Sequence, residues 1–149
     1  MKAIYFDMDG TIANLYGVSG WLENIQARNT RPYEQAKVML KMNVLARLLN
    51  KLQKEGYVIG VVSWLAKNST QEYNERVTQA KVNWLQKHLP SVHWNEVHIV
   101  DYGTPKQTVV QYSKGILFDD EEPNRKNWTG TAYDVNNIIE VLKGLLQPF

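Results

Sequence analysis

Short apolar runs that alternate with longer amphipathic stretches constrain the fold of this chain more than any other feature. Five runs have the length and composition of β-strands, at residues 2–6, 57–62, 97–100, 115–118 and 130–133. The second and fourth are nearly continuous in apolar character, which is typical of strands covered on both faces. Strands that alternate with helices predict a doubly wound, Rossmann-like α/β fold, in which a parallel sheet of about five strands carries helices on both faces.

Helical patterns fill four of the stretches between and after these runs, at residues 34–55, 70–88, 105–113 and 135–146. The first places Val38, Met42, Leu45, Leu49 and Leu52 at a spacing of three or four residues, as on one face of a helix. Gly56 follows this stretch, where a helix C-cap is expected. Ser69 and Glu72 predict a capping box at the start of the second stretch.

The chain of 149 residues is expected to form one domain, residues 1–149, that is long enough to bury a core. The absence of cysteine excludes disulfides and cysteine metal sites, and it fits a cytoplasmic location. A net charge of +2 does not indicate nucleic-acid binding, and the basic residues within 34–55 are interpreted as a solvated helix face. No run approaches the length of a membrane helix, so no membrane contact is expected.

Two carboxylates end the first apolar run. Asp7 and Asp9 are two residues apart, so on an extended strand they point the same way and lie roughly 6–7 Å apart. A gap of this size can hold a metal ion or a phosphoryl group. Gly10 then allows the backbone to turn sharply, and the Thr11 hydroxyl either contacts the phosphate or caps this turn.

Asp119 and Asp120 end the fourth apolar run, so the sequence predicts four carboxylates at one edge of the sheet. Their mutual repulsion would raise some of their pKa values or open the fold. A hard divalent cation compensates for such a cluster, and Mg²⁺ is the usual choice near phosphate. A single aspartate is more often a helix cap or a turn residue, but two pairs that both end apolar strands favour a metal site.

Polar groups also follow the other two strands. Ser63 comes at the end of the second run, and its hydroxyl could donate a hydrogen bond to a phosphoryl oxygen. Trp64 follows it and is the first candidate to stack on a substrate ring, with Trp21 the second. Lys106 lies in the first turn of the predicted helix 105–113, where it opposes the helix dipole. This position favours a lysine that faces an anion.

In order and spacing, these motifs resemble those of the haloacid dehalogenase-like (HAD) phosphohydrolases over almost the full chain. The first motif is similar to Asp7-Met8-Asp9-Gly10-Thr11, the second to Ser63, the third to Lys106 and the fourth to Asp119-Asp120. The stretch from Lys106 to Asp120, with Pro123 and Asn124 after it, looks closest to the 5'(3')-deoxyribonucleotidase branch. Trp128-Thr129-Gly130 is loosely similar to that branch as well.

The resemblance implies a two-step reaction. Asp7 would attack phosphorus and form an aspartyl-phosphate, and Asp9 would protonate the leaving oxygen and later activate water. Lys106 and Ser63 would hold the transferring oxygens. Mg²⁺ would be bound by Asp7, the backbone carbonyl of Asp9, and the pair Asp119 and Asp120.

The chain departs from the nucleotidase branch in one place. Those enzymes carry a helical cap after the first motif, whereas here residues 12–33 leave room only for a flap or mini-lid and for no separate cap domain. The resulting hypothesis is a Mg²⁺-dependent phosphomonoesterase that acts on a small phosphorylated substrate, with a nucleotide as the leading candidate. The alternatives are a phosphatase for polynucleotide ends or phosphosugars, and a non-catalytic binding module on the same scaffold.

Overall fold

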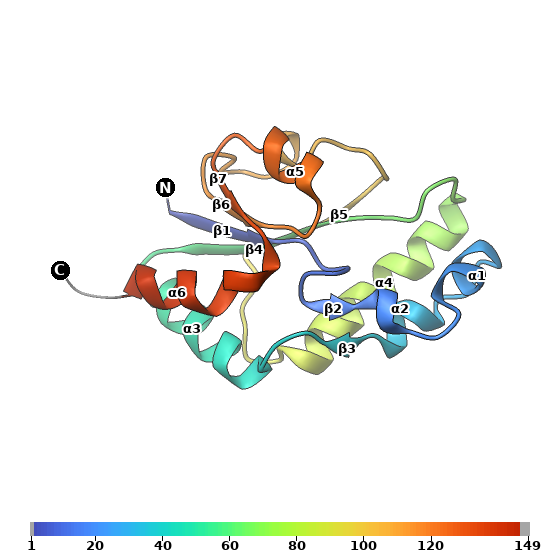
Figure 1. Cartoon of the computed structure of the whole chain (residues 1–149), viewed down its shortest axis with the longest axis horizontal. Helices are drawn as coiled ribbons and strands as arrows, with labels where there is room; N and C mark the ends of the chain where they lie inside the picture. The colour runs from blue at the N-terminus through green and yellow to red at the C-terminus, as the bar shows by residue number, and fades with distance from the viewer. Residues whose placement is uncertain (1, 147–149) are drawn as a thin grey trace.

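The strands expected from the apolar runs pair into one parallel sheet in the computed structural model, which describes residues 2–146 (Figure 1). The strands of this sheet are β1 (Ala3–Phe6), β4 (Val58–Trp64), β5 (Glu96–Val100), β6 (Ile116–Phe118) and β7 (Thr131–Tyr133). They lie in the order β5-β4-β1-β6-β7, and each neighbouring pair is parallel. The predicted α/β fold with a five-stranded parallel sheet is therefore confirmed.

Strand β1 lies at the centre of this sheet and is buried along its whole length. It pairs with β4 on one edge and with β6 on the other. Its side chains alternate between two cores, with Ile4 and Phe6 in one and Ala3 and Tyr5 in the other. The strand that leads into Asp7 is thus fixed by hydrogen bonds on both edges and by packing on both faces.

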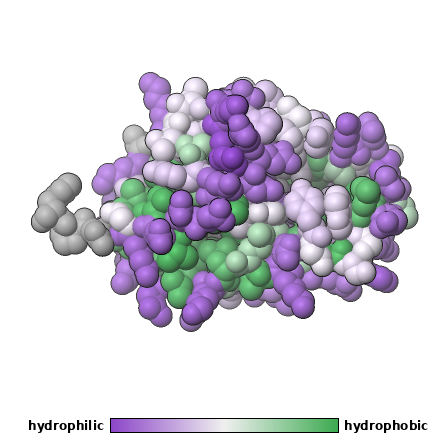
Figure 2. All heavy atoms as spheres, viewed as in Figure 1, coloured by the Kyte–Doolittle hydropathy of each residue, from purple (hydrophilic) through white to green (hydrophobic). Residues whose placement is uncertain are grey.

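Helices cover both faces of the sheet (Figure 1). The larger core lies under α3 (Met42–Lys54), α4 (Gln71–His88) and α6 (Ile138–Leu146), the last of which follows the 3₁₀-helix η3 (Val135–Asn137). The short helix α5 (Glu122–Asn127) lies on the opposite side. Apolar side chains also gather at the surface over α3 and α6 (Figure 2). Within residues 2–146, none of the helices combines the length and the apolar character needed to cross a membrane.

The helix predicted for residues 34–55 is wrong over its first turns. This stretch instead contains the end of α2 (Arg31–Gln35), the strand β3 (Lys37–Val38) and then α3. Val38 pairs with Ala13 of β2 (Ala13–Asn14), so backbone pairing prevails over the apolar spacing that placed Val38 on a helix face. Gly56 follows α3 with φ of +98°, which agrees with the expected C-cap.

Two other helix predictions need correction. Helix α4 is capped by Thr70, whose Oγ1 accepts a hydrogen bond from the Tyr73 amide at 3.2 Å, so the capping box predicted at Ser69 is wrong by one residue. Residues 105–113 form only the 3₁₀-helix η2 (Lys106–Thr108). A run of three β-branched residues begins at the end of η2, and such residues favour extended backbone over helix.

Residues 12–33, the predicted flap, fold into a small layer of their own. This layer contains β2, the 3₁₀-helix η1 (Leu15–Gly17), α1 (Trp21–Gln26) and the start of α2. It continues to β3, which pairs with β2, and we call residues 13–38 the insertion. The insertion packs on α4, because Leu15 and Tyr33 form a buried cluster with Tyr73.

The packing of α3 predicts the cost of removing one of its core side chains. Leu52 is 0% exposed, so Leu52→Ala should lower the free energy of unfolding by about 2–5 kcal/mol, because it leaves a cavity in the larger core. Lys51→Ala, on the exposed face of the same helix, should change it by less than about 0.5 kcal/mol. Urea denaturation followed by tryptophan fluorescence measures both, and equal losses would contradict this placement of α3.

Candidate active site

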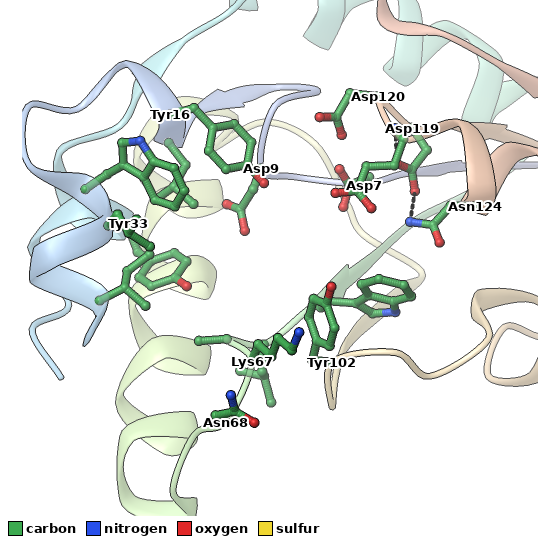
Figure 3. A pocket seen from close by; sticks show the side chains of 18 of the residues that line it. Asp7, Asp9, Tyr16, Tyr33, Lys67, Asn68, Tyr102, Asp119, Asp120 and Asn124 are labelled. Carbon is green, nitrogen blue, oxygen red and sulfur yellow. Dashed lines mark hydrogen bonds between the residues drawn. The ribbon is translucent and has the colours of Figure 1, made fainter. Parts of the chain in front are cut away.

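Three carboxylates from two neighbouring strands meet at the carboxyl edge of the sheet (Figure 3). Asp7 directly follows β1, and Asp119 and Asp120 directly follow β6. One oxygen from each carboxylate lies within 4.8 Å of the other two. The parallel pairing of β1 with β6 places the two strand ends side by side, at the edge where open α/β sheets bind ligands.

The turn after β1 explains the residues that follow Asp7. Gly10 has φ of +81°, and a Cβ at this position would collide with the carboxylate of Asp120. The Thr11 hydroxyl donates a hydrogen bond to Asp7 Oδ2 at 3.0 Å. Thr11 is 1% exposed and is not among the residues that line the cavity, so in this structure its hydroxyl orients the Asp7 carboxylate.

Lys106 is buried between two of the carboxylates. Its Nζ lies 2.9 Å from Asp7 Oδ1 and 2.6 Å from Asp119 Oδ2. These two charges raise the pKa of Lys106 against the opposing effect of burial, so the ammonium group is charged at neutral pH. Lys106 therefore does face anionic groups, as the sequence predicted. The helix dipole is not the reason for this position, because η2 spans only three residues.

Asp119 and Asp120 have different environments, although they are adjacent in the sequence. Asp119 accepts hydrogen bonds from Lys106 and from Asn124 Nδ2 at 3.2 Å (Figure 3), so its oxygens are largely occupied. Burial and the charge of Asp7 raise the pKa of Asp119 to about 6, against the lowering effect of Lys106. No ion pair within residues 2–146 compensates Asp120, and burial together with the charge of Asp7 raises its pKa to about 8.

The fourth carboxylate, Asp9, is paired with a lysine that the sequence reasoning missed. Lys81 Nζ lies 2.9 Å from Asp9 Oδ2, and the side chain of Lys81 is 1% exposed. Burial raises the pKa of Asp9, and the Lys81 charge opposes that effect. The Asp9 side chain is therefore directed to α4. The predicted contact of its backbone carbonyl with a metal stays a prediction.

A sequence signal for Lys81 exists in hindsight. Helix α4 buries Tyr73, Val77, Ala80 and Trp84 along one face, and Lys81 falls within this face. A lysine at a core position of an amphipathic helix is rarely buried without a charged partner.

Ser63, predicted to hold a phosphoryl oxygen, is also fully buried, and its Oγ accepts a hydrogen bond from Lys81 at 2.8 Å.

The charges of the site leave room for a divalent cation. Four carboxylates face two buried ammonium groups, which leaves two negative charges when all six groups are ionised. The donor set of Asp7, Asp119 and Asp120 consists of carboxylate oxygens, as hard cations prefer. Asp120, which lacks an ammonium partner among the described residues, is the carboxylate with most to gain from such an ion. The residues present therefore fit Mg²⁺.

A cavity of about 560 Å³ opens over these carboxylates. Two aromatic pairs form part of its wall (Figure 3). The insertion supplies Tyr16 and Trp21, whose ring centroids are 4.9 Å apart, and the sheet edge supplies Trp64 and Tyr102, at 5.0 Å. Trp64 and Trp21, the two predicted stacking candidates, thus both reach the cavity. Trp84 is buried and is not among the residues that line the cavity.

Polar side chains line the cavity away from the carboxylates. Lys67 and Asn68 follow β4 (Figure 3). Arg28 comes from the insertion. Arg28 Nη2 donates a hydrogen bond to the backbone carbonyl of Asn68 at 2.6 Å, so the insertion and the loop after β4 are joined at the rim. The cavity is therefore acidic at one end, aromatic along its sides and basic or polar at the other end.

Comparison with known proteins supports the fold. The chain is similar to the crystal structure of D,D-heptose 1,7-bisphosphate phosphatase from Burkholderia thailandensis, with a TM-score of 0.53, 11% identity, and coverage of 99% of this chain and 100% of that chain. It is also similar to the HAD domain of the effector protein Lem4 from Legionella pneumophila, with a TM-score of 0.48, 14% identity, and coverage of 97% and 93%. The first likeness confirms the doubly wound α/β fold. No protein-family model and no curated protein matches the sequence.

The raised pKa values predict how metal binding depends on pH. In the metal-free protein, Asp119 and Asp120 bind protons more tightly when folded than when unfolded, so the free energy of unfolding should fall as pH rises from about 4 to about 8. Mg²⁺ competes with these protons and should raise the melting temperature more above pH 8 than below pH 6. Thermal melts with and without Mg²⁺ across this range measure both effects.

The Asp120→Asn variant distinguishes Mg²⁺ binding at this site from a general effect of salt on the melting temperature. The variant should lose most of the Mg²⁺-induced rise in melting temperature, and it should be more stable than the wild type without metal above pH 8, because one buried charge is removed. Asp101→Asn, at an exposed position after β5, is the matched control and should respond to Mg²⁺ as the wild type does. An unchanged Mg²⁺ response in Asp120→Asn would contradict this metal site.

Proposed function

We propose that this protein is a Mg²⁺-dependent phosphomonoesterase that works through an aspartyl-phosphate at Asp7. The observation that carries the proposal is the position of Asp7. Its carboxylate lines the cavity, accepts a hydrogen bond from Lys106, and lies within reach of Asp119 and Asp120 at the edge of the sheet. A carboxylate nucleophile needs cations beside it before an anionic phosphate can approach. Lys106 is one such cation, and Mg²⁺ held by the carboxylates would offset the remaining negative charge.

The reaction divides between the two aspartates that follow β1. An Asp7 oxygen attacks phosphorus, the bond from phosphorus to the leaving oxygen breaks, and Asp9 gives its proton to that oxygen, which leaves as an alcohol. Water then loses a proton to Asp9 and attacks the same phosphorus. The bond between phosphorus and Asp7 breaks, which releases inorganic phosphate and restores both carboxyl groups.

The other charged residues support this division. Lys106 keeps one Asp7 oxygen fixed at 2.9 Å, and Thr11 fixes the other at 3.0 Å, so the carboxylate is held in one orientation. Mg²⁺ held by Asp7, Asp120 and the backbone carbonyl of Asp9 would neutralise charge on the transferring phosphoryl group. Among the adjacent pair, Asp120 is the proposed direct ligand, because Lys106 and Asn124 already occupy Asp119.

A nucleoside monophosphate is the proposed substrate. The cavity is large enough for a body beyond the phosphate, and its aromatic pairs can stack on a planar ring. Beyond these rings, the Asn68 amide could donate and accept hydrogen bonds at the edge of a base. Lys67, in the same loop, adds a positive charge to this end of the cavity. A phosphosugar would satisfy the carboxylate end of this cavity but would leave its aromatic sides without a matching group.

Hydrolysis of a generic aryl phosphate tests the phosphatase. The wild type with Mg²⁺ should release phosphate, and Asp7→Asn should lower kcat by roughly 10³-fold or more, because an amide cannot form the acyl phosphate. Acid-quenched wild-type protein should yield a phosphorylated peptide that contains Asp7. Asp101→Asn should keep the wild-type rate. The proposal fails if the wild type is inactive or if Asp7→Asn is equally active.

A substrate panel tests the nucleotide proposal separately. Nucleoside monophosphates should give a higher kcat/KM than phosphosugars or 3'-phosphorylated oligonucleotides. Trp21→Ala should raise KM for the preferred nucleotide more than KM for an aryl phosphate, because the smaller substrate does not fill the cavity. Met39→Ala, exposed and outside the cavity wall, is the control. A higher kcat/KM for phosphosugars or oligonucleotides would reassign the substrate and leave the phosphatase intact.

A further inference from the structure

Lys81 is a buried cation for which the proposed reaction has no role so far. It lies on α4, and its side chain is 1% exposed. Its Nζ makes three hydrogen bonds, to Asp9 Oδ2 at 2.9 Å, to Ser63 Oγ at 2.8 Å and to the Trp64 carbonyl at 2.8 Å. An ammonium group has three hydrogens, so all of its donor capacity is used.

Stability alone does not account for a lysine at this position. The same face of α4 is otherwise apolar, and an apolar residue at position 81 would avoid the cost of desolvating an ammonium group. Two of the three acceptors belong to β4, which pairs with β1, the strand that leads into Asp7 and Asp9, so the ammonium group is anchored to the sheet. The Tyr33 ring, with its centroid 5.2 Å from Nζ, closes the side toward the insertion.

We infer that Lys81 is a positioning residue that fixes the Asp9 carboxylate for proton transfer to the leaving oxygen. This inference rests on the phosphatase function proposed above. Lys81 holds Oδ2, so the proton that Asp9 handles is carried on Oδ1. Lys81 is absent from the cavity wall that Asp9 helps to form, so it acts through Asp9 and does not contact the substrate.

The two lysines of the site then have separate tasks. Lys106 orients the nucleophile Asp7, and Lys81 orients the acid and base Asp9. Without Lys81, the Asp9 side chain could turn toward the metal site or toward solvent, which would remove the proton donor while the nucleophile stays in place. The loss should therefore depend on how much the leaving oxygen needs a proton.

Substrates with different leaving groups test this dependence. For Lys81→Met, kcat/KM for an alkyl phosphate should fall by about 10–100-fold, while kcat/KM for an aryl phosphate with a stable phenolate falls by less than about 3-fold. The ratio kcat/KM reports the step that expels the leaving group, and it does not include the later attack of water, which Asp9 assists for both substrates. The affinity for either substrate should change little, because Lys81 does not line the cavity. Lys87→Met, at an exposed position of the same helix, should match the wild type. Equal losses on both substrates, or no loss on either, would overturn the inference.

A double-mutant cycle distinguishes action through Asp9 from a separate effect. In the background of Asp9→Ala, Lys81→Met should cause no further loss with the alkyl phosphate, because the group that it positions is already absent. A further loss of the same factor would overturn the inference. If the wild type hydrolyses neither substrate, the proposed function fails and the inference falls with it. If the wild type is active and Lys81→Met keeps its alkyl-to-aryl ratio, the inference alone fails.

The absence of cysteine provides a test that does not depend on the folding of Lys81→Met. The single thiol of Lys81→Cys can be alkylated in the unfolded chain with 2-bromoethylamine, which restores an ammonium group, or with iodoacetamide, which adds a neutral amide. After refolding, the ammonium form should regain the wild-type alkyl-to-aryl ratio, and the amide form should not. The same ratio in both forms, or refolding of the ammonium form alone, would make Lys81 a structural residue and overturn the inference.

Discussion

The meeting of four carboxylates and two buried lysines at one edge of the sheet is the constraint on which the rest of this site depends. Carboxylates this close would repel one another and bind protons, and the two ammonium groups offset only part of that cost. Burial, together with the charge of Asp7, raises the pKa of Asp120. The central strand β1 tolerates this arrangement because it is paired on both edges and packed on both faces.

The distribution of the lysines matters as much as their number. Lys106 bridges Asp7 and Asp119, which leaves Asp120 as the carboxylate open to a metal. Lys81 pairs with Asp9 alone and keeps its side chain apart from that group. On a regular strand, Asp7 and Asp9 would point the same way and have similar surroundings. In this structure Asp7 contacts Lys106 and Asp9 contacts Lys81. The proposed division into nucleophile and proton carrier requires such different environments.

The sequence was sufficient for the sheet and for the carboxylates, because both depend on local patterns. Apolar runs mark buried strands, and polar residues after them mark the edge where ligands bind. It was insufficient where distant pairing decides the outcome. Val38 fits a helix pattern but pairs with Ala13, and Lys81 resembles any helical lysine until the fold brings Asp9 to it. The signal at Lys81 lies in its position on the buried face of α4, and residue type alone conceals it.

Helix α4 links the chemistry to the cavity. One of its faces packs against Leu15 and Tyr33 of the insertion, and the same face carries Lys81. The Tyr33 ring lies against the ammonium group that holds Asp9, and Tyr33 also lines the cavity. A substrate that contacts Tyr33 in the cavity would therefore contact the side chain that lies against Lys81. Under the proposed function, Tyr33 thus connects the part of the cavity that would hold the substrate body with the lysine that positions Asp9.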